Sequence, residues 1–465
     1  MFSPRRGFVL LGMLILGSVL CAVPAVGGPV DSTTIMQPGD LELSGQSPEI
    51  LAAISQFRRG ERESALKSLE AAAKSDPELP PPRVMLARML LFDREVDAAR
   101  KLLEEVASQL PEYLGTYALF GNLAMAEGRI SDAQAQYEKV LRLAEESKDQ
   151  PDRKRLEMRG WSGLASVAEA RRDWTTATDA LRHCLERDPA NGSARQRLAR
   201  ALFNSGEVDK ATSELEQAVR DDGRLEPVET QLGRLYADAK EPEVALRWLQ
   251  EGTRKSPDDA RAHAAVALFH SQQERPEEAL PAIENALKLD ANGRQTQLLA
   301  AIVCRQLADY TTAEKHLQRL FDENPTDFQV INLLALVLIE QPREADHRRA
   351  LQLAQMNTQR FPKSNEARAT LGWIQLRQGR LDEASKALQG ALSQGAATPD
   401  TAYYIARRHA KLGETNEALR LLNQALEAPL GRFAYRKQAQ TLLKQLSDEA
   451  KSTTGASKTK PKERK

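Results

Sequence analysis

The chain has 465 residues, and its 65 lysines and arginines balance 65 aspartates and glutamates, so the formal net charge is zero. This balance argues against a nucleic-acid-binding protein, which needs a sustained basic face. Three cysteines are too few for a disulfide framework. Length alone suggests about three domains, but internal repetition replaces that expectation with one continuous array.

Residues 1–28 differ in composition from everything that follows. Two arginines precede an uncharged run from Phe8 to Val26, and small residues stand near its end. This pattern is typical of a secretory signal peptide, with cleavage near Ala25. The run is also almost long enough to span a bilayer, so an uncleaved N-terminal anchor is the alternative. We therefore expect an exported protein, periplasmic or extracellular, or one anchored to the cytoplasmic membrane.

Two further segments lack apolar periodicity. Residues 29–45 contain proline, glycine and serine and are predicted to form a disordered spacer. Residues 451–465 carry six basic residues and one acid and are predicted to form a disordered basic tail.

Between these segments, over residues 46–450, the chain repeats itself. Eleven alanines recur at nearly constant spacing, and eight of the ten gaps between them are 34 residues. A stack of identical small units explains such spacing, because each unit meets its neighbour through the same contact. The alanine column consists of Ala65, Ala99, Ala133, Ala177, Ala211, Ala245, Ala279, Ala313, Ala350, Ala384 and Ala418.

Other columns keep step with the alanines and indicate two antiparallel helices in each unit. Glycine often stands five residues before the alanine, where it allows a left-handed turn between helices. Proline stands twelve residues after it in six units, where a helix ends or begins. A column of small residues lies twelve positions before the alanine, shifted in one repeat, and permits close helix crossing: Ala53, Ala87, Gly121, Ala165, Ala199, Gly233, Ala267, Ala301, Ala335, Gly372 and Ala406.

The segment Met158–Asn191 shows these columns together, and it resembles the tetratricopeptide repeat. Trp161, Leu164, Ala177 and Pro189 fall where the pattern W-x2-L-G-x2-Y…A-x3-F…P places them. Most other repeats lack the tryptophan, and several lack the proline. The resemblance implies an all-α, right-handed superhelical solenoid of about eleven helical hairpins. Its concave groove would hold peptides or protein partners.

Three places depart from the regular repeat. The gap before Ala177 has ten extra residues, which fall within Glu145–Arg159 and predict a long helix that breaks there. The gap before Ala350 has three extra residues. After Leu430, the segment Phe433–Lys451 predicts a C-terminal capping helix that covers the last repeat, as solenoids need for solubility.

The sequence contains no recognisable catalytic, cofactor or metal-binding motif. It lacks H-E-x-x-H, C-x-x-C, a phosphate-binding loop and G-x-S-x-G. His263 and His270 lie seven residues apart, too far for one metal ion without a third ligand. Cys184 and Cys304 are predicted to be small buried residues without a bond between them. We expect no enzyme, cofactor or metal, and an enzyme acting on cell-wall glycans is the remote alternative.

In the family that the chain resembles, the first helix of each unit lines the concave side. The residue after each small-column position is then the expected groove position, polar in the N-terminal half and apolar from Leu268 to Trp373. Packing between adjacent hairpins is the alternative role for the apolar stripe. The candidate partner-binding residues are Arg88, Asn122, Arg200, Arg234, Leu268, Ile302, Leu336, Trp373, Tyr403 and Arg407.

These observations predict a non-enzymatic scaffold or adaptor that binds proteins or peptides outside the cytoplasm. Arg88, Arg200 and Arg234 would favour acidic groups of a ligand, and Trp373 would be the strongest apolar anchor. The alternative is an accessory or regulatory subunit of an envelope complex, held on the membrane by residues 8–26. The partner is an unidentified protein or peptide, and no nucleic acid is expected.

Overall fold

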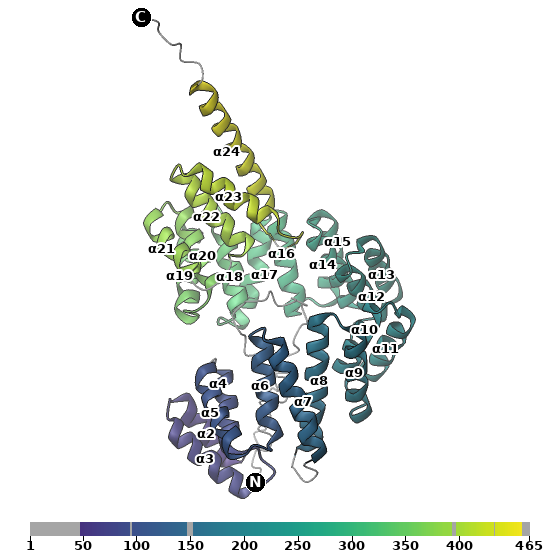
Figure 1. Ribbon diagram of the computed structural model, residues 1–465. Helices are drawn as coiled ribbons and strands as arrows, with labels where there is room; N and C mark the ends of the chain where they lie inside the picture. Colours follow the sequence, from purple (N-terminus) through teal and green to yellow (C-terminus); the bar gives the residue numbers. More distant parts are fainter. Residues whose placement is uncertain (1–46, 94, 147–151, 393–396, 432, 458–465) are drawn as a thin grey trace, which may run out of the picture. The chain divides into compact units, whose positions relative to one another are not determined.

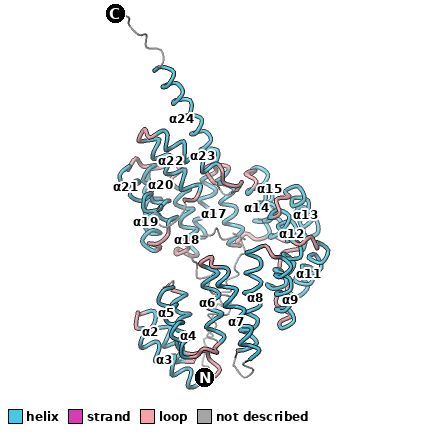
Figure 2. The backbone as a smooth tube through the Cα atoms, in the orientation of Figure 1, coloured by secondary structure: helices cyan, strands magenta, loops and turns pink. Residues whose placement is uncertain are grey.

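The structure is a computed structural model that describes residues 47–93, 95–146, 152–392, 397–431 and 433–457. Those residues form 23 helices joined by short loops, and no strand occurs among them (Figure 2). The chain divides into two compact units, residues 1–170 and 171–465, within which successive helices pack as antiparallel hairpins. The predicted all-α repeat fold is confirmed.

Unit 1 contains three hairpins followed by a longer helix (Figure 1). The hairpins pair α2 with α3, α4 with α5, and α6 with α7. The helices are α2 (Pro48–Arg58), α3 (Arg62–Ser75), α4 (Pro82–Phe92), α5 (Val96–Gln109), α6 (Leu114–Ala126), α7 (Ile130–Glu146) and α8 (Arg153–Arg171).

Unit 2 contains α9, seven hairpins and a terminal helix, α24, that packs against α23. In each hairpin the even-numbered helix is the first and the odd-numbered helix the second. The helices are α9 (Trp174–Arg187), α10 (Gly192–Asn204), α11 (Val208–Asp221), α12 (Val228–Asp238), α13 (Pro242–Lys255), α14 (Ala260–Gln272), α15 (Pro276–Leu289), α16 (Arg294–Gln306), α17 (Tyr310–Glu323), α18 (Phe328–Leu338), α19 (Glu344–Arg360), α20 (Asn365–Arg377), α21 (Leu381–Leu392), α22 (Pro399–Lys411), α23 (Thr415–Leu426) and α24 (Arg436–Ser457).

The alanine column holds the hairpins together, as the spacing predicted. Each alanine is the fourth residue of its second helix, except Ala350, which is the seventh residue of α19. All eleven have 0% exposed surface. A methyl side chain at this position allows the two helices of a hairpin to approach closely, since a larger group would hold them apart.

The column of small residues on the first helices likewise has no room for larger side chains. At its three glycines, an added Cβ would lie 2.5 Å from the Tyr137 ring at Gly121, 2.6 Å from Leu249 at Gly233 and 2.7 Å from Leu388 at Gly372. The large side chain opposite each glycine therefore occupies the volume that a methyl group would need. The pairing of a small residue with a large one maintains the packing from repeat to repeat.

Every turn described five residues before a regularly placed alanine adopts a left-handed conformation. Five of these positions are glycines with φ between 72° and 85°, as predicted. At four others the same turn carries a side chain: Arg172, Lys240, Glu274 and Ala308 have φ between 57° and 63°. Since this conformation is unfavourable for residues with a Cβ, hairpin geometry overrides local preference at those four turns.

The proline column marks the junctions between hairpins. Each of the six prolines lies two residues after the end of a second helix, which agrees with the prediction. A feature that the sequence analysis missed lies beside it. The side chain six residues later bonds to the junction carbonyl, as at Tyr117–Pro111 (2.7 Å), Arg195–Pro189 (2.7 Å) and Gln297–Ala291 (2.6 Å). Chemically different side chains thus satisfy the same carbonyl.

The irregular spacings correspond to longer helices. The ten extra residues lengthen both α7 and α8, where one long helix was expected, and residues 147–151 between them lie outside the described part. The three extra residues lengthen the start of α19 to 17 residues in all. Helix α24 continues through Ser457, past residue 451, where the disordered tail was expected to begin.

Several predictions concern residues that the structure does not describe or does not test. The signal peptide and spacer, residues 1–45, lie outside the described ranges, and so does Cys21. No helix among the described residues is long and apolar enough to cross a membrane. Cys184 and Cys304 are both buried, as predicted, and neither forms a disulfide.

Candidate binding face of the first helices

The predicted partner-binding residues all lie on first helices, but they differ in exposure. In unit 1, Arg88 on α4 is only 3% exposed, and two of its guanidinium nitrogens, Nε and Nη2, have no hydrogen-bond partner in the described part of the chain. Asn122 on α6 is half-buried, and its Oδ1 accepts a hydrogen bond from the Tyr137 hydroxyl at 2.8 Å. Arg88 is therefore not an exposed groove residue as expected, because its helix is buried along almost its whole length.

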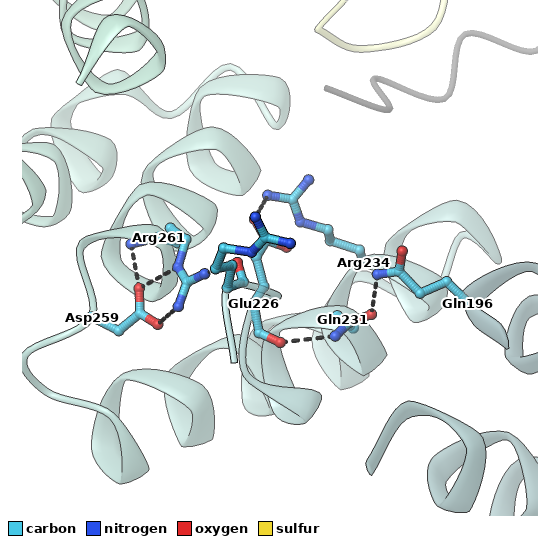
Figure 3. Close-up of polar contacts among 7 residues, drawn as sticks. Gln196, Glu226, Gln231, Arg234, Asp259 and Arg261 are labelled. Carbon is cyan, nitrogen blue, oxygen red and sulfur yellow. Dashed lines mark hydrogen bonds and ion pairs between the residues drawn. The ribbon is translucent and has the colours of Figure 1, made fainter. Parts of the chain in front are cut away.

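In unit 2, Arg200 on α10 and Arg234 on α12 belong to a polar face, of which Figure 3 shows the surroundings of Arg234. Arg234 Nη2 donates to Glu226 Oε1 at 2.6 Å, and Glu226 lies in the loop before α12. Gln196 on α10 donates to Gln231 on α12 at 2.9 Å. Gln231 in turn donates to the Glu226 carbonyl oxygen at 2.8 Å. This network joins two successive first helices and fixes the direction of the Arg234 side chain.

The same face continues to the start of α14. Asp259, the residue before that helix, is paired with Arg261 through an Nη2–Oδ2 contact of 2.6 Å (Figure 3). The aspartate also accepts the backbone N–H of Arg261 at 2.8 Å, as a helix-capping carboxylate does. Burial raises the pKa of this carboxyl, but the stronger combined effect of the bonds to Arg261 lowers it below its usual value.

Two carboxyl groups on this face have pKa values above their usual range. For Glu226 the main cause is burial, and Arg234 and Arg261 oppose it. For Asp238 the main cause is again burial, opposed by Arg200 and Arg234. The predicted arginines therefore serve as counter-charges to carboxylates of the same chain. The sequence analysis had not identified those carboxylates.

The apolar stripe begins half-buried and becomes fully buried toward the C-terminus. Leu268 on α14 and Ile302 on α16 are half-buried. Leu336 on α18 is 6% exposed and lies in a continuous hydrophobic core that also contains Leu298, Ile339 and Leu376. For Leu336 the packing role is therefore the correct alternative, and the expectation of an exposed groove residue was wrong.

Trp373 on α20 and Tyr403 on α22 form the centre of an aromatic cluster. Trp373 is 2% exposed and stacks on Tyr404, with ring centres 4.7 Å apart and planes at 17°. Tyr403 is 3% exposed and stacks on Tyr435 at 5.2 Å and 15°. Burial raises the pKa of Tyr403 to about 12. Arg407, one turn further along α22, is half-buried.

The cluster is closed by residues from the loop after α23 and by the first residue of α24, which together we call the return segment: Gly431 and Phe433–Arg436. This part of the chain runs back to the turn after α14 (Figure 1). Arg436 Nε donates to Glu274 Oε1 at 2.8 Å. Ala434 N–H donates to Asp400 Oδ1 on α22 at 3.1 Å. The sequence analysis had assigned these residues only to the start of a capping helix.

The contacts of the return segment show that four first helices of unit 2, α14, α16, α20 and α22, face one common space. They come from the end of α14, from Arg305 on α16, from Trp373 on α20 and from Tyr403 and Tyr404 on α22. Successive first helices also contact one another directly, α14 with α16, α18 with α20, and α20 with α22. A single short segment can reach all of them only if their exposed faces converge.

The described residues show no arrangement suited to a metal ion: no group of three or more His, Cys, Asp or Glu side chains is placed to hold one. An open hollow of about 570 Å³ lies at the junction before α14, between Lys255 and Arg261, with Asp290 on its other side. Among its charged side chains, Lys255 is paired with Glu229 at 2.6 Å and Asp259 with Arg261 at 2.6 Å.

Comparison with known proteins places the chain in a family. Two tetratricopeptide repeat models match it, one over residues 168–229 and the other over residues 118–191, 230–294 and 343–401. The human protein O-mannosyl-transferase TMTC3 is 24% identical over 255 residues, which are 54% of this chain. The matched region spans only 27% of the length of that relative.

Two solved structures are similar to the chain at low identity. The APC/C hetero-tetramer Cut9–Hcn1 is 16% identical, with 87% of this chain and 97% of that chain covered and a TM-score of 0.40. Yeast Tom70 is 13% identical, with 87% and 96% covered and a TM-score of 0.37. The repeat columns, the helical hairpins and the matching family models agree, and the chain belongs to the tetratricopeptide repeat family.

Proposed function

We propose that this protein is a non-enzymatic scaffold that binds protein or peptide segments on the first-helix face of its repeats. The observation that carries the proposal is that this face already holds a polypeptide in unit 2, namely the return segment. Aromatic rings, paired arginines and buried carboxylates on the face suit the side chains and backbone amides of another chain. The catalytic name of the human relative belongs to a protein of which only 27% is matched.

We further propose that it acts outside the cytoplasm. The support is the sequence of residues 1–28, in which a basic start, an uncharged run and small residues follow one another as in a signal peptide. The alternative is an accessory subunit that keeps residues 8–26 as a membrane anchor. In both forms the repeats would serve the assembly of an envelope complex or the recruitment of a partner.

Fractionation together with mass spectrometry tests the location. The full sequence would be expressed in a bacterial host, and the mature N-terminus would be measured in each fraction. A soluble exported form that has lost Phe8 supports the cleaved version. Retention of Phe8 in the membrane fraction supports the anchored alternative, and an intact cytoplasmic protein contradicts both.

Site-specific photocrosslinking tests the binding face. A photoreactive residue would replace Arg200 or Leu268 on first helices, and Arg220 on α11, an exposed position on a second helix, is the matched control. We expect a defined crosslinked partner from the first-helix positions only. Equal crosslinking from Arg220, or none from either first-helix position, contradicts the proposed face.

A further inference from the structure

We propose that the return segment is an intramolecular ligand. On this proposal, the face formed by α14, α16, α20 and α22 is a site for a peptide turn with the order aromatic, small, aromatic, arginine. The inference rests on the proposed function and adds the chemistry of the bound segment. It also adds regulation, because the chain's own Phe433–Arg436 competes with any partner for the site.

Four side chains that surround Tyr435 recognise the second aromatic position. The Tyr435 ring centre lies 5.2 Å from Tyr403, 5.5 Å from Trp373 and 5.5 Å from Tyr404. The Tyr403 ring is stacked on it, and the other two meet it edge-on. The Arg305 guanidinium lies 5.1 Å from the centre of the same ring. Stacked, edge-on and cationic contacts together select a flat aromatic side chain over an aliphatic one.

The first aromatic position and the small residue are recognised separately. Phe433 packs edge-on against Tyr403, with ring centres 6.1 Å apart, and is 3% exposed. Between the two aromatic residues, Ala434 gives its backbone N–H to Asp400 Oδ1 at 3.1 Å. A backbone contact of this kind holds the segment whatever the side chain of this residue, while the rings on either side supply selectivity.

The arginine position is fixed by charge. Arg436 Nε lies 2.8 Å from Glu274 Oε1, and both side chains are largely shielded, at 12% and 21% exposed. Its Nη1 also donates to the Leu426 carbonyl oxygen at 2.8 Å, at the C-terminal end of α23. A guanidinium offers several donors in one plane and can satisfy a carboxylate and helix-end carbonyls at once.

The N-terminal edge of the site admits glycine alone. Gly431 has φ of +73°, and a Cβ added there would lie 2.6 Å from the carbonyl oxygen of Gln272 at the end of α14. Backbone cannot move aside as a flexible side chain can, so the chain passes here only without a side chain. This close backbone contact forms one edge of the proposed site, next to the rings that contact Phe433 and Tyr435.

Helix α24 has contacts of its own that do not depend on the return segment. It packs against α23, and its Ala439, Leu442 and Leu446 are buried in the same hydrophobic core as Phe433 and Tyr435. Arg436 is the first residue of α24 and pairs with Glu274, 162 positions away, in the turn after α14. On the proposal, release breaks the contacts of the return segment with the first-helix face and leaves the α23–α24 contact in place.

The test is binding of an added peptide with the sequence of residues 429–438, PLGRFAYRKQ, labelled with fluorescein. It would be titrated against the full chain and against the Phe433→Ala/Tyr435→Ala variant, which keeps Arg436 in place. Because a tethered segment competes at an effective concentration of about a millimolar, we expect the variant to bind the peptide at least about tenfold more tightly than the full chain. A peptide with alanine at both aromatic positions is the control and is expected not to bind.

A folded variant that does not bind the peptide, or that binds the control peptide equally well, overturns the proposal. If the double variant fails to fold, Arg436→Gln replaces it, because that change removes the tethered guanidinium and leaves Glu274 for the arginine of the added peptide. Arg254→Gln, which breaks an ion pair with Glu251 on α13, is its matched control. We expect Arg436→Gln alone to speed hydrogen exchange at Ala434 and to raise peptide affinity severalfold. Equal behaviour of the two glutamine variants overturns the proposal.

The outcome of the peptide-binding test can be distinguished from the outcome of the crosslinking test of the proposed function. Crosslinking of a partner from Arg200 or Leu268 without peptide binding would reject the intramolecular ligand and leave the scaffold function standing. Peptide binding without any crosslinked partner would support the site while the scaffold function fails.

Discussion

Two regions of unit 2 use the same column of first-helix residues in different ways. From α10 to α14 the column presents Arg200 and Arg234, whose charges are balanced by nearby carboxylates such as Glu226 and Asp238. From α16 to α22 it presents Ile302, Leu336, Trp373 and Arg407, and the aromatic part is covered by the return segment. The first region remains partly exposed to solvent, and in the second Leu336 and Trp373 are enclosed while Ile302 and Arg407 are half-buried.

The difference follows from what each kind of side chain requires. The Arg234–Glu226 pair, with side chains 41% and 26% exposed, contributes about 1 kcal/mol or less and can be exchanged for a ligand carboxylate at small cost. Large aromatic side chains each gain about 1.5–3 kcal/mol from full burial. A face rich in Trp and Tyr is therefore stable when something covers it, and here the chain itself does so.

The largest effect is expected where a charge enters the enclosed region. Leu336→Glu would place a carboxylate in the hydrophobic core and cost about 4 kcal/mol or more of unfolding free energy. Leu268→Glu, at a half-buried position of the same column, is expected to cost about 1 kcal/mol. Urea denaturation followed by circular dichroism measures both. Equal tolerance of the two changes would show that the regions do not differ in burial.

Truncation of the central aromatic residue comes next. Trp373→Ala removes the ring that stacks on Tyr404 and contacts Tyr435, and we expect a loss of about 3–5 kcal/mol. Hydrogen exchange is also expected to accelerate at Ala434, because the return segment loses part of its pocket. A loss below about 1 kcal/mol, measured by urea denaturation, would mean that the ring does not anchor this region.

A stabilising change is expected at a turn within the second region. Ala308, in the turn between α16 and α17, has φ of +61°, a conformation that glycine adopts without steric cost. Ala308→Gly is expected to raise the unfolding free energy by about 1 kcal/mol, despite the greater entropy of glycine in the unfolded chain. Gly379→Ala, at the corresponding turn before α21, is the reverse control and is expected to destabilise. Thermal denaturation that moves in the opposite direction for either variant contradicts this account of the turns.

A smaller effect is expected in the polar region. Glu226→Gln removes the charge opposite Arg234 and is expected to cost less than about 1 kcal/mol. The difference from the unchanged chain is expected to shrink in 1 M salt, since exposed charges are screened. Paired urea denaturation curves at low and high salt measure this. A salt-independent loss above about 2 kcal/mol would show that the pair is structural and not available to a ligand.

The smallest expected effect is a pH dependence at His316 on α17, whose Nδ1 lies 2.6 Å from Gln297 Oε1. Burial first, and then Arg319 and Lys315, lower its pKa below the ordinary 6.5. The unfolded chain thus takes up the proton first, so the contribution to stability is present above pH 6.5 and is lost as the pH falls below it. His316→Gln is expected to reduce the fall in unfolding midpoint between pH 7 and pH 5.5. An unchanged pH profile would contradict the assignment.

Much of the fold was predictable because the hairpin contact is local and recurs. The alanine column, the glycine turns and the prolines each mark a position that short-range geometry restricts, and eleven copies separate the pattern from chance. The left-handed turns at Lys240 and Glu274 were not predictable, because their residue types do not favour that conformation. There the packing of two helices outweighs local preference.

The sequence predicted which helices carry the candidate binding face, but not which of its residues are exposed. The column after the small residues does lie on first helices, as with Arg234 and Trp373. Whether such a residue is exposed depends on what covers it, and neither the carboxylate of Glu226 nor the ring of Tyr435 follows a repeat spacing. Whether these residues bind a partner remains a prediction.

The sequence by itself determined the repeat, its register and the family, because each unit contains its own small contacts and helix ends within 34 residues. Only the tertiary structure decided that the loop after α23 returns to the end of α14 and that Tyr435 completes the aromatic cluster. A contact between residues 162 positions apart leaves no periodic trace in the chain. It depends on the curvature that many successive repeats build up together, and no single repeat encodes that curvature.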